Sequence, residues 1–294
     1  MDLDQLRTLL AVVEHGSFTR AATALGLSQS TVSAHIKLLE SDVGAQLLDR
    51  DRGRVELTSQ GAILVGYARQ ILTLRQQALS HLHAERSGVV GQLAITASTI
   101  GAEHLLPPLL AALRHSHRGV AVRLEVGNSR GALASLAQRT CELAVVGRAS
   151  GDRRFEFRPF GADEIVLVGP LPDRYQLPLD GTANLREVPI VGRGEGSGTR
   201  AATEMLLAEH CGLAERPLDI EVGSTESAKR CVLHGLGVTF ISRFAVADEL
   251  LAGRMQVIPL RGTPVARTFH VAWLRGATLS PAAEAFLKLA LPSA

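Results

Sequence analysis

The chain opens with three short segments of helical periodicity whose connections leave room only for a compact bundle. In the first 45 of 294 positions, apolar residues recur at spacings of three and four. Gly16 is placed to end the first helix, and Ser17 and Gly26 to begin and end the second. Ser28 is placed to begin a third helix, which stops just before Gly44. The sequence therefore predicts three tightly connected helices.

The second and third helices are joined by the turn Gly26-Leu27-Ser28. The small residues Ala21 and Ala22 allow another helix to approach closely. Two helices connected in this way form the pattern of a helix-turn-helix. A generic three-helix bundle has the same spacing, so these residues alone leave both interpretations open.

The next segment, Gln46 to Thr58, has two short extended pieces on either side of Asp51-Arg52-Gly53. This turn signal predicts a small hairpin, or wing, that carries Arg50, Arg52 and Arg54. Such arginines form either a solvated surface or, behind a helix-turn-helix, contacts to phosphates.

A long helix is predicted from Ser59 to about Glu85, because the segment contains no proline. Its narrow apolar seam favours burial against a second helix and thus a dimerising linker, although an ordinary amphipathic helix packed on its own domain remains an alternative. The seam comprises Leu64, Tyr67, Ile71, Leu74, Ala78 and Leu82.

Beyond Gly88, strand-like runs alternate with helical ones. This alternation predicts a mostly parallel α/β sheet, or two such sheets side by side. In such folds, ligands bind at the carboxyl ends of strands, beside helix N-termini. The predicted strands are 92–97, 120–126, 143–147, 165–168, 189–191, 237–242 and 269–274, and the predicted helices are 103–115, 130–139, 199–211, 225–234 and 282–291.

Composition excludes several classes of protein. Hydrophobic residues make up 46% and charged residues 20% of the chain, as in ordinary globular domains. Every apolar run is shorter than the ~18 residues of a membrane span, and the N-terminus lacks the features of a signal peptide, so we expect a cytoplasmic protein without a membrane partner. The net charge of +2 indicates no partner. Three scattered cysteines, Cys141, Cys211 and Cys231, argue against disulfides and a thiolate metal site.

The first 60 residues resemble the winged helix-turn-helix of LysR-type transcriptional regulators. The resemblance rests on the motifs GSFTRAA, LSQSTVS and IKLLE, and on the LT-x-x-G that opens the linker helix. It implies a DNA-binding domain (1–58), a dimerising linker helix (59–87) and an effector-binding domain (88–294). The effector domain would be an α/β module of two Rossmann-like subdomains, like a periplasmic binding protein, with subdomain I at about 88–163 and 267–294 and subdomain II at about 164–266.

A narrower resemblance lies in the effector module. The stretches ASTIGAEHLLPPLL, LEVGNS, RGEGSGTR and EVGSTESAKR are similar to the subgroup of LysR-type regulators that controls sulfur assimilation and carbon fixation. That subgroup responds to small anions or phosphorylated metabolites. The implied partners are therefore a small anionic effector, a promoter inverted repeat in double-stranded DNA, and a second copy or three further copies of the chain, with RNA polymerase as a candidate.

The third helix supplies the side chains that a recognition helix uses. Gln29 can pair with both N6 and N7 of adenine, and Thr31 can contact a thymine methyl group. Each polar residue can instead simply face solvent. The candidate DNA-binding residues are Ser28, Gln29, Ser30, Thr31, Ser33, His35, Lys37, Arg50, Arg52 and Arg54.

Three predicted helices of the effector module begin with hydroxyl-bearing residues just after strands. Helix N-termini with free N–H groups favour anions, and hydroxyls add further donors. These hydroxyls can also act merely as helix caps. The candidate effector-binding residues are Ser98, Thr99, Asn128, Ser129, Arg148, Ser197, Thr199, Arg200, Ser224 and Thr225.

An enzymatic function has little support in the sequence. The glycine cluster GRGEGSG lacks the lysine of a Walker loop, and Glu195 replaces the first glycine of a nucleophile elbow. We therefore expect no catalytic residues, no metal and no cofactor. The leading prediction is a sequence-specific DNA-binding transcriptional regulator controlled by a small anion or by a phosphorylated or carboxylated metabolite. The alternative is a two-lobed small-molecule binding protein without a transcriptional role.

Overall fold

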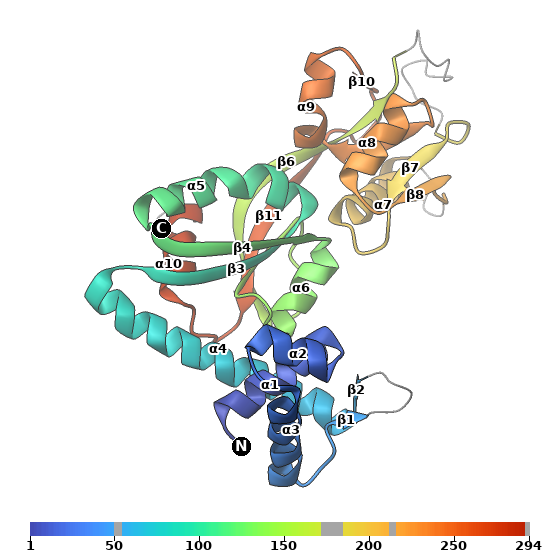
Figure 1. Cartoon of the computed structure of the whole chain (residues 1–294). Helices are drawn as coiled ribbons and strands as arrows, with labels where there is room; N and C mark the ends of the chain where they lie inside the picture. The colour runs from blue at the N-terminus through green and yellow to red at the C-terminus, as the bar shows by residue number, and fades with distance from the viewer. Residues whose placement is uncertain (50–54, 172–184, 212–215, 292–294) are drawn as a thin grey trace. The chain divides into compact units, whose positions relative to one another are not determined.

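Figure 1 shows the computed structural model of the chain, which divides into two compact units. The first unit comprises Met1–Ser87 and the short segment Gln138–Thr140, and the second comprises Gly88–Ala137 and Cys141–Ala294. Each unit encloses an apolar core of its own. The residues that the structure describes are 1–49, 55–171, 185–211 and 216–291.

Three helices form the body of the first unit, and they end where the sequence predicts. The Ser28 hydroxyl accepts a hydrogen bond from the Thr31 backbone N–H at 3.0 Å and so caps the third helix. Ser17 caps the second helix in the same way. The helices are α1 (Leu3–His15), α2 (Phe18–Leu25) and α3 (Gln29–Val43), and each is closed by a left-handed glycine, Gly16, Gly26 or Gly44.

The apolar faces of these helices share one core. Ala21 and Ala22 on α2 are almost fully buried, which gives the close approach expected from their small side chains. Val32, Ile36 and Leu39 project from α3 into the same core, so the opposite side of α3 is left to solvent. The periodicity of the sequence thus decides which face of α3 is free.

The predicted hairpin follows α3. Strands β1 (Leu48–Asp49) and β2 (Glu56–Leu57) pair antiparallel, with Leu48 opposite Leu57. The connecting tip, with Arg50, Arg52 and Arg54, lies outside the described residues.

Helix α4 (Ser59–Ser87) starts in the core of the first unit and continues well beyond it. Val65 and Ala68 are buried, and Leu64 packs against the same core. Leu64 therefore does not belong to a free seam, and Ile63 takes its place. The exposed apolar residues of this helix, here called the α4 stripe, are Ile63, Tyr67, Ile71, Leu74 and Leu82.

The described residues of the second unit form one mixed sheet of nine strands. Its order is β4-β3-β5-β11-β6-β9-β7-β8, with β10 paired to β6. Pairs β3–β4, β3–β5, β7–β8 and β7–β9 are parallel, as predicted, whereas β6 and β11 run antiparallel to their neighbours. The strands are β3 (Val90–Ser98), β4 (Gly119–Gly127), β5 (Leu143–Val146), β6 (Phe155–Gly169), β7 (Ile190–Arg193), β8 (Ile220–Val222), β9 (Val238–Ser242), β10 (Gln256–Val257) and β11 (Val265–Leu274).

The two long strands β6 and β11 link two lobes (Figure 1). Lobe I contains β3–β5 with a core around Phe269 and Phe286, and lobe II contains β7–β10 with a core around Leu167 and Val238. The lobe I helices are η2 (Gly101–Leu105, a π-helix), α5 (Leu106–Ser116), α6 (Ser129–Ala137) and α10 (Pro281–Ala290), and the lobe II helices are α7 (Gly198–Cys211), α8 (Thr225–Leu233) and α9 (Arg243–Leu251).

Some elements lack a clear sequence pattern. Helix α9 was not predicted, because Phe244 and Leu251 face solvent and blur its apolar periodicity. The first half of β6 was missed because Pro159 and exposed polar residues interrupt it. Strands β8 and β10 have only three and two residues, too few for a recognisable alternation.

Candidate functional sites

The exposed side of α3 carries the polar residues that the sequence predicts for base contacts. Gln29 and Ser30, in the first turn of α3, are exposed, and so is Lys37 two turns further on. The Ser28 hydroxyl lies 2.7 Å from that of Ser30 and 2.8 Å from that of Thr31, so the first turn of α3 forms a connected polar group. These residues are placed where a partner can reach them.

Other predicted DNA-binding residues are less accessible. Thr31, Ser33 and His35 are half-buried. The His35 Nδ1 atom lies 2.9 Å from the hydroxyl oxygen of the buried Thr8 on α1. This contact fixes α3 against α1, so His35 has a structural partner within the unit.

In the second unit, strand ends and helix starts from both lobes surround a small pocket, here called the interlobe pocket. Lobe I contributes the ends of β3, β4 and β5, and lobe II contributes the starts of α7 and α8. The hydroxyls of Ser98 and Thr199 belong to buried residues on opposite lobes. Seven of the ten predicted effector-binding residues line this pocket: Ser98, Thr99, Asn128, Ser129, Ser197, Thr199 and Thr225.

The other three predicted residues lie outside it. Ser224 caps α8 by accepting a hydrogen bond from the Ser227 backbone N–H at 3.0 Å. The Arg200 guanidinium is neutralised by Glu221 at 2.6 Å and Glu204 at 2.8 Å. Arg148 is directed elsewhere, its Nη1 donating to the Met205 sulfur at 3.4 Å.

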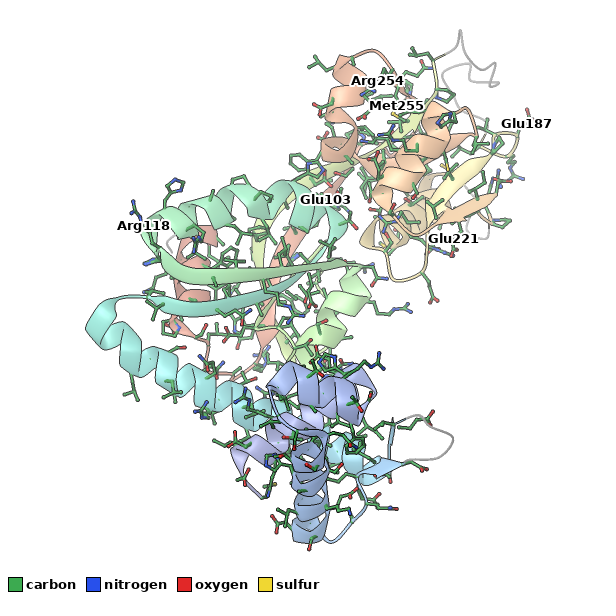
Figure 2. All side chains as sticks on the ribbon, viewed as in Figure 1. Glu103, Arg118, Glu187, Glu221, Arg254 and Met255 are labelled. Carbon is green, nitrogen blue, oxygen red and sulfur yellow. The ribbon has the colours of Figure 1, made fainter. Side chains whose placement is uncertain are left out.

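Arg193, at the end of β7, lines the pocket but was not among the sequence candidates. Its side chain donates to the Thr225 hydroxyl and, at 3.0 Å, to the Gly223 carbonyl oxygen. Its buried Nε has no hydrogen-bond partner among the described residues. Burial lowers the pKa of Arg193, and the nearby Arg267 lowers it further, while Glu103 on η2 raises it (Figure 2). A search for arginines at strand ends, as well as for hydroxyls at helix starts, would have found Arg193.

Arg267, on β11, is the second cation of the pocket that sequence reasoning missed. Its Nε and Nη2 donate to the Asp163 carboxylate at 2.8 and 2.6 Å, and its Nη1 donates to the Thr199 hydroxyl at 3.1 Å. The guanidinium also lies 4.6 Å from the centre of the Phe269 ring. Burial lowers the pKa of Arg267, and the Asp163 charge opposes that effect. No local sequence signal connects Arg267 with Asp163, because they are 104 positions apart.

The interlobe pocket is lined by cationic side chains and by hydrogen-bond donors. Two guanidiniums line it, and among the described residues only the Asp163 carboxylate forms an ion pair with either of them. The buried Ser98 hydroxyl, like Arg193 Nε, has no partner in the described part of the chain. The space between these groups is about 20 Å³, which is enough for one water-sized group. This arrangement suits an anion.

No cluster of three or more His, Cys, Asp or Glu side chains among the described residues is arranged to hold a metal ion. No helix in the described ranges is both long enough and apolar enough to span a membrane.

Both units of the chain match known protein families. Residues 3–62 match the bacterial regulatory helix-turn-helix protein, lysR family, and residues 86–294 match the LysR substrate binding domain. The chain belongs to the LysR family. This confirms the resemblance inferred from the motifs, and the LysR-type chain is a DNA-binding transcriptional regulator with an effector-binding domain.

Two curated relatives indicate which subgroup of the LysR family the chain is similar to. The chain is 34% identical over 289 residues to the HTH-type transcriptional regulator CfxR of Cupriavidus necator, a match that covers 97% of this chain and 89% of CfxR. It is 32% identical over 300 residues to the RuBisCO operon transcriptional regulator of Allochromatium vinosum, covering 100% and 97% of the two chains. These relatives confirm the likeness to the carbon-fixation subgroup.

Two solved structures support the fold. Full-length CbnR, in complex with its target DNA, has a TM-score of 0.69 and 22% identity, and the match covers 99% of each chain. The CcmR regulatory domain of Synechocystis PCC6803, in complex with 2-PG, has a TM-score of 0.59 and 24% identity over 67% of this chain and 94% of that domain. The predicted helix-turn-helix and two-lobed α/β module are thus confirmed.

Proposed function

We propose that this regulator responds to a small oxyanion, either inorganic or the phosphate or carboxylate group of a metabolite, bound in the interlobe pocket. The observation that carries this proposal is Arg193, a buried guanidinium with no carboxylate within ion-pair distance among the described residues and with an unpartnered Nε. An oxyanion would accept from Arg193 Nε and from the Ser98 hydroxyl, which satisfies both donors at once. The 2-PG bound to CcmR, 2-phosphoglycolate, belongs to this chemical class.

The size of the pocket indicates how such a ligand acts. A free space of about 20 Å³ does not admit a phosphorylated metabolite unless the lobes or the Arg267 side chain move. A ligand that binds only the rearranged form shifts the population toward that form. We therefore expect the effector to change the arrangement of the two lobes, and through it the arrangement of the oligomer on DNA.

On DNA, we assign base readout to the first turn of α3. Gln29 is suited to an adenine and Thr31 to a thymine methyl group, while Lys37 is suited to a phosphate. We assign His35 a positioning role through its contact with Thr8. The wing arginines Arg50, Arg52 and Arg54 remain sequence-based candidates for phosphate contacts.

The α4 stripe supports a symmetric dimer, because large apolar side chains exposed along one helix are best buried against a second copy of that helix. A two-fold dimer binds an inverted repeat with half-sites about one helical turn apart. We place this homodimer, or a tetramer built from it, in the cytoplasm at a promoter, where RNA polymerase is a candidate partner. Its role is regulatory and not enzymatic, like that of the family to which it belongs.

The direct test is calorimetry of the full-length protein with 2-phosphoglycolate and with sulfate, after a thermal-shift comparison of the two anions. Arg193→Gln should weaken binding of the active anion tenfold or more, since hydrogen bonds to charged groups contribute roughly 1.5–3 kcal/mol. Arg200→Gln is the matched control, because Glu204 and Glu221 already neutralise that arginine outside the pocket. Equal loss in both variants, or no loss in Arg193→Gln, would contradict the assignment.

A further inference from the structure

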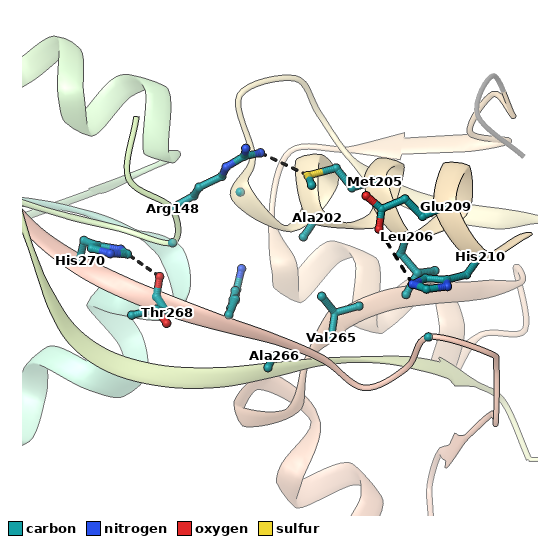
Figure 3. A pocket seen from close by; sticks show the side chains of 14 residues that line it. Arg148, Ala202, Met205, Leu206, Glu209, His210, Val265, Ala266, Thr268 and His270 are labelled. Carbon is teal, nitrogen blue, oxygen red and sulfur yellow. Dashed lines mark hydrogen bonds and ion pairs between the residues drawn. The ribbon is translucent and has the colours of Figure 1, made fainter. Parts of the chain in front are cut away.

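A larger cavity of about 360 Å³ lies beside α7, and Figure 3 shows the residues that line it. We call it the α7 pocket. Gly147, Gly198 and Arg267 line both this cavity and the interlobe pocket, so they form the boundary between the two. The remaining lining residues differ, and they are chemically unlike those of the interlobe pocket.

The walls of the α7 pocket are largely apolar. Ala202, Met205 and Leu206 contribute from one side of α7, and Val265 and Ala266 contribute from β11. Met205 is 46% exposed, so part of its side chain is open to a ligand in the cavity. The cavity lies within the usual range for small-molecule sites, about 300–1,000 Å³.

One cation projects over this apolar surface. Arg148 follows β5 and extends across the cavity toward Met205 (Figure 3). Within the described part of the chain, its only hydrogen bond is to the Met205 sulfur, a weak acceptor. Among the described residues, no carboxylate lies within 4.0 Å of the Arg148 guanidinium. The guanidinium is thus free to form a bidentate pair with an incoming acid.

The end of the cavity away from Arg148 carries polar side chains. The His210 ring lies there with the Glu209 carboxylate 4.0 Å from its Nε2. A Cβ atom on Gly262 would come within 2.6 Å of that ring, so the glycine lets the chain pass closely beside His210. Because the Glu209 charge repels a second anionic group, this end disfavours a phosphate dianion or a dicarboxylate.

We propose that the α7 pocket is a second ligand site, which takes a monocarboxylate with a compact apolar body of roughly ten non-hydrogen atoms. The carboxylate pairs with Arg148, and the apolar body lies against Ala202, Leu206 and Val265, where burial of apolar surface adds affinity. This site is independent of the oxyanion proposed for the interlobe pocket, which has buried arginines and hydroxyls but little apolar surface facing a ligand.

The test uses two probes of equal shape, phenylacetate and its uncharged analogue phenylacetamide, titrated into the full-length protein and followed by ligand-observed NMR. We expect phenylacetate to bind at least tenfold more tightly than phenylacetamide. Arg148→Gln should remove this preference, whereas Arg153→Gln, a change at an exposed arginine outside the cavity, should leave it intact.

A second variant tests the apolar body. Ala202→Leu occupies part of the cavity and should weaken both probes at least tenfold. Arg148 also lines a separate groove with Arg130 and Glu195, but Ala202 does not, so this variant distinguishes the two. The proposal is overturned if phenylacetate binds Arg148→Gln and Ala202→Leu as well as wild type, if no binding is detected, or if Arg193→Gln abolishes its binding while both of these variants retain it. The last result would place the acid in the interlobe pocket.

Discussion

At the scale of single residues, Gln29 and Lys37 are both exposed on α3 but should serve different purposes. Gln29→Ala should relax base preference at one position of the DNA site, with a loss of about 1–3 kcal/mol on the preferred sequence. Lys37→Gln should weaken all sequences alike and lower the salt dependence by about one phosphate contact. In-vitro selection of preferred sites checks both, and unchanged preferences in Gln29→Ala would remove its assignment to base readout.

Asp163 lies on β6 and binds Arg267 on β11, so it joins the two strands that link the lobes. Its carboxylate is fully buried, accepts two hydrogen bonds from Arg267 and accepts a third from the Ser242 hydroxyl at 2.9 Å. Asp163→Asn leaves the Arg267 charge buried without its counter-ion, so it should lower the free energy of unfolding by about 3–5 kcal/mol. Urea denaturation measures this loss. Glu164→Gln, at an exposed pair with Arg243, should cost at most about 1 kcal/mol.

At the scale of elements, the sequence predicts structure best where a local signal exists. Ser28 and Gly44 bound α3 because caps act within one turn, and the hydroxyls of Ser98 and Thr199 were identified as pocket residues because each stands at a strand end or a helix start. Arg267 was missed because its role arises only when β11 pairs with β6 and brings it to Asp163. Contacts between distant segments leave no periodic trace in the sequence.

The α4 stripe makes a prediction about the linker helix. Leu74→Glu places a charge among exposed apolar side chains that we expect to be buried in a dimer, so the variant should dissociate at concentrations where wild type remains dimeric. Gln76→Glu, an exposed residue away from the stripe, should leave the oligomer intact. Light scattering coupled to size-exclusion chromatography distinguishes the two, and an unchanged mass for Leu74→Glu would show that the stripe does not hold the dimer.

At the scale of the whole molecule, we expect an oxyanion bound at Arg193 to alter the complex of the regulator with DNA. The most direct measurement is the DNase I footprint on the promoter inverted repeat, recorded with and without 2-phosphoglycolate for wild type, Arg193→Gln and Arg200→Gln. We expect a footprint that the ligand changes in wild type and Arg200→Gln but not in Arg193→Gln, while all three proteins bind equally well without ligand. A ligand-dependent change that persists in Arg193→Gln would contradict it.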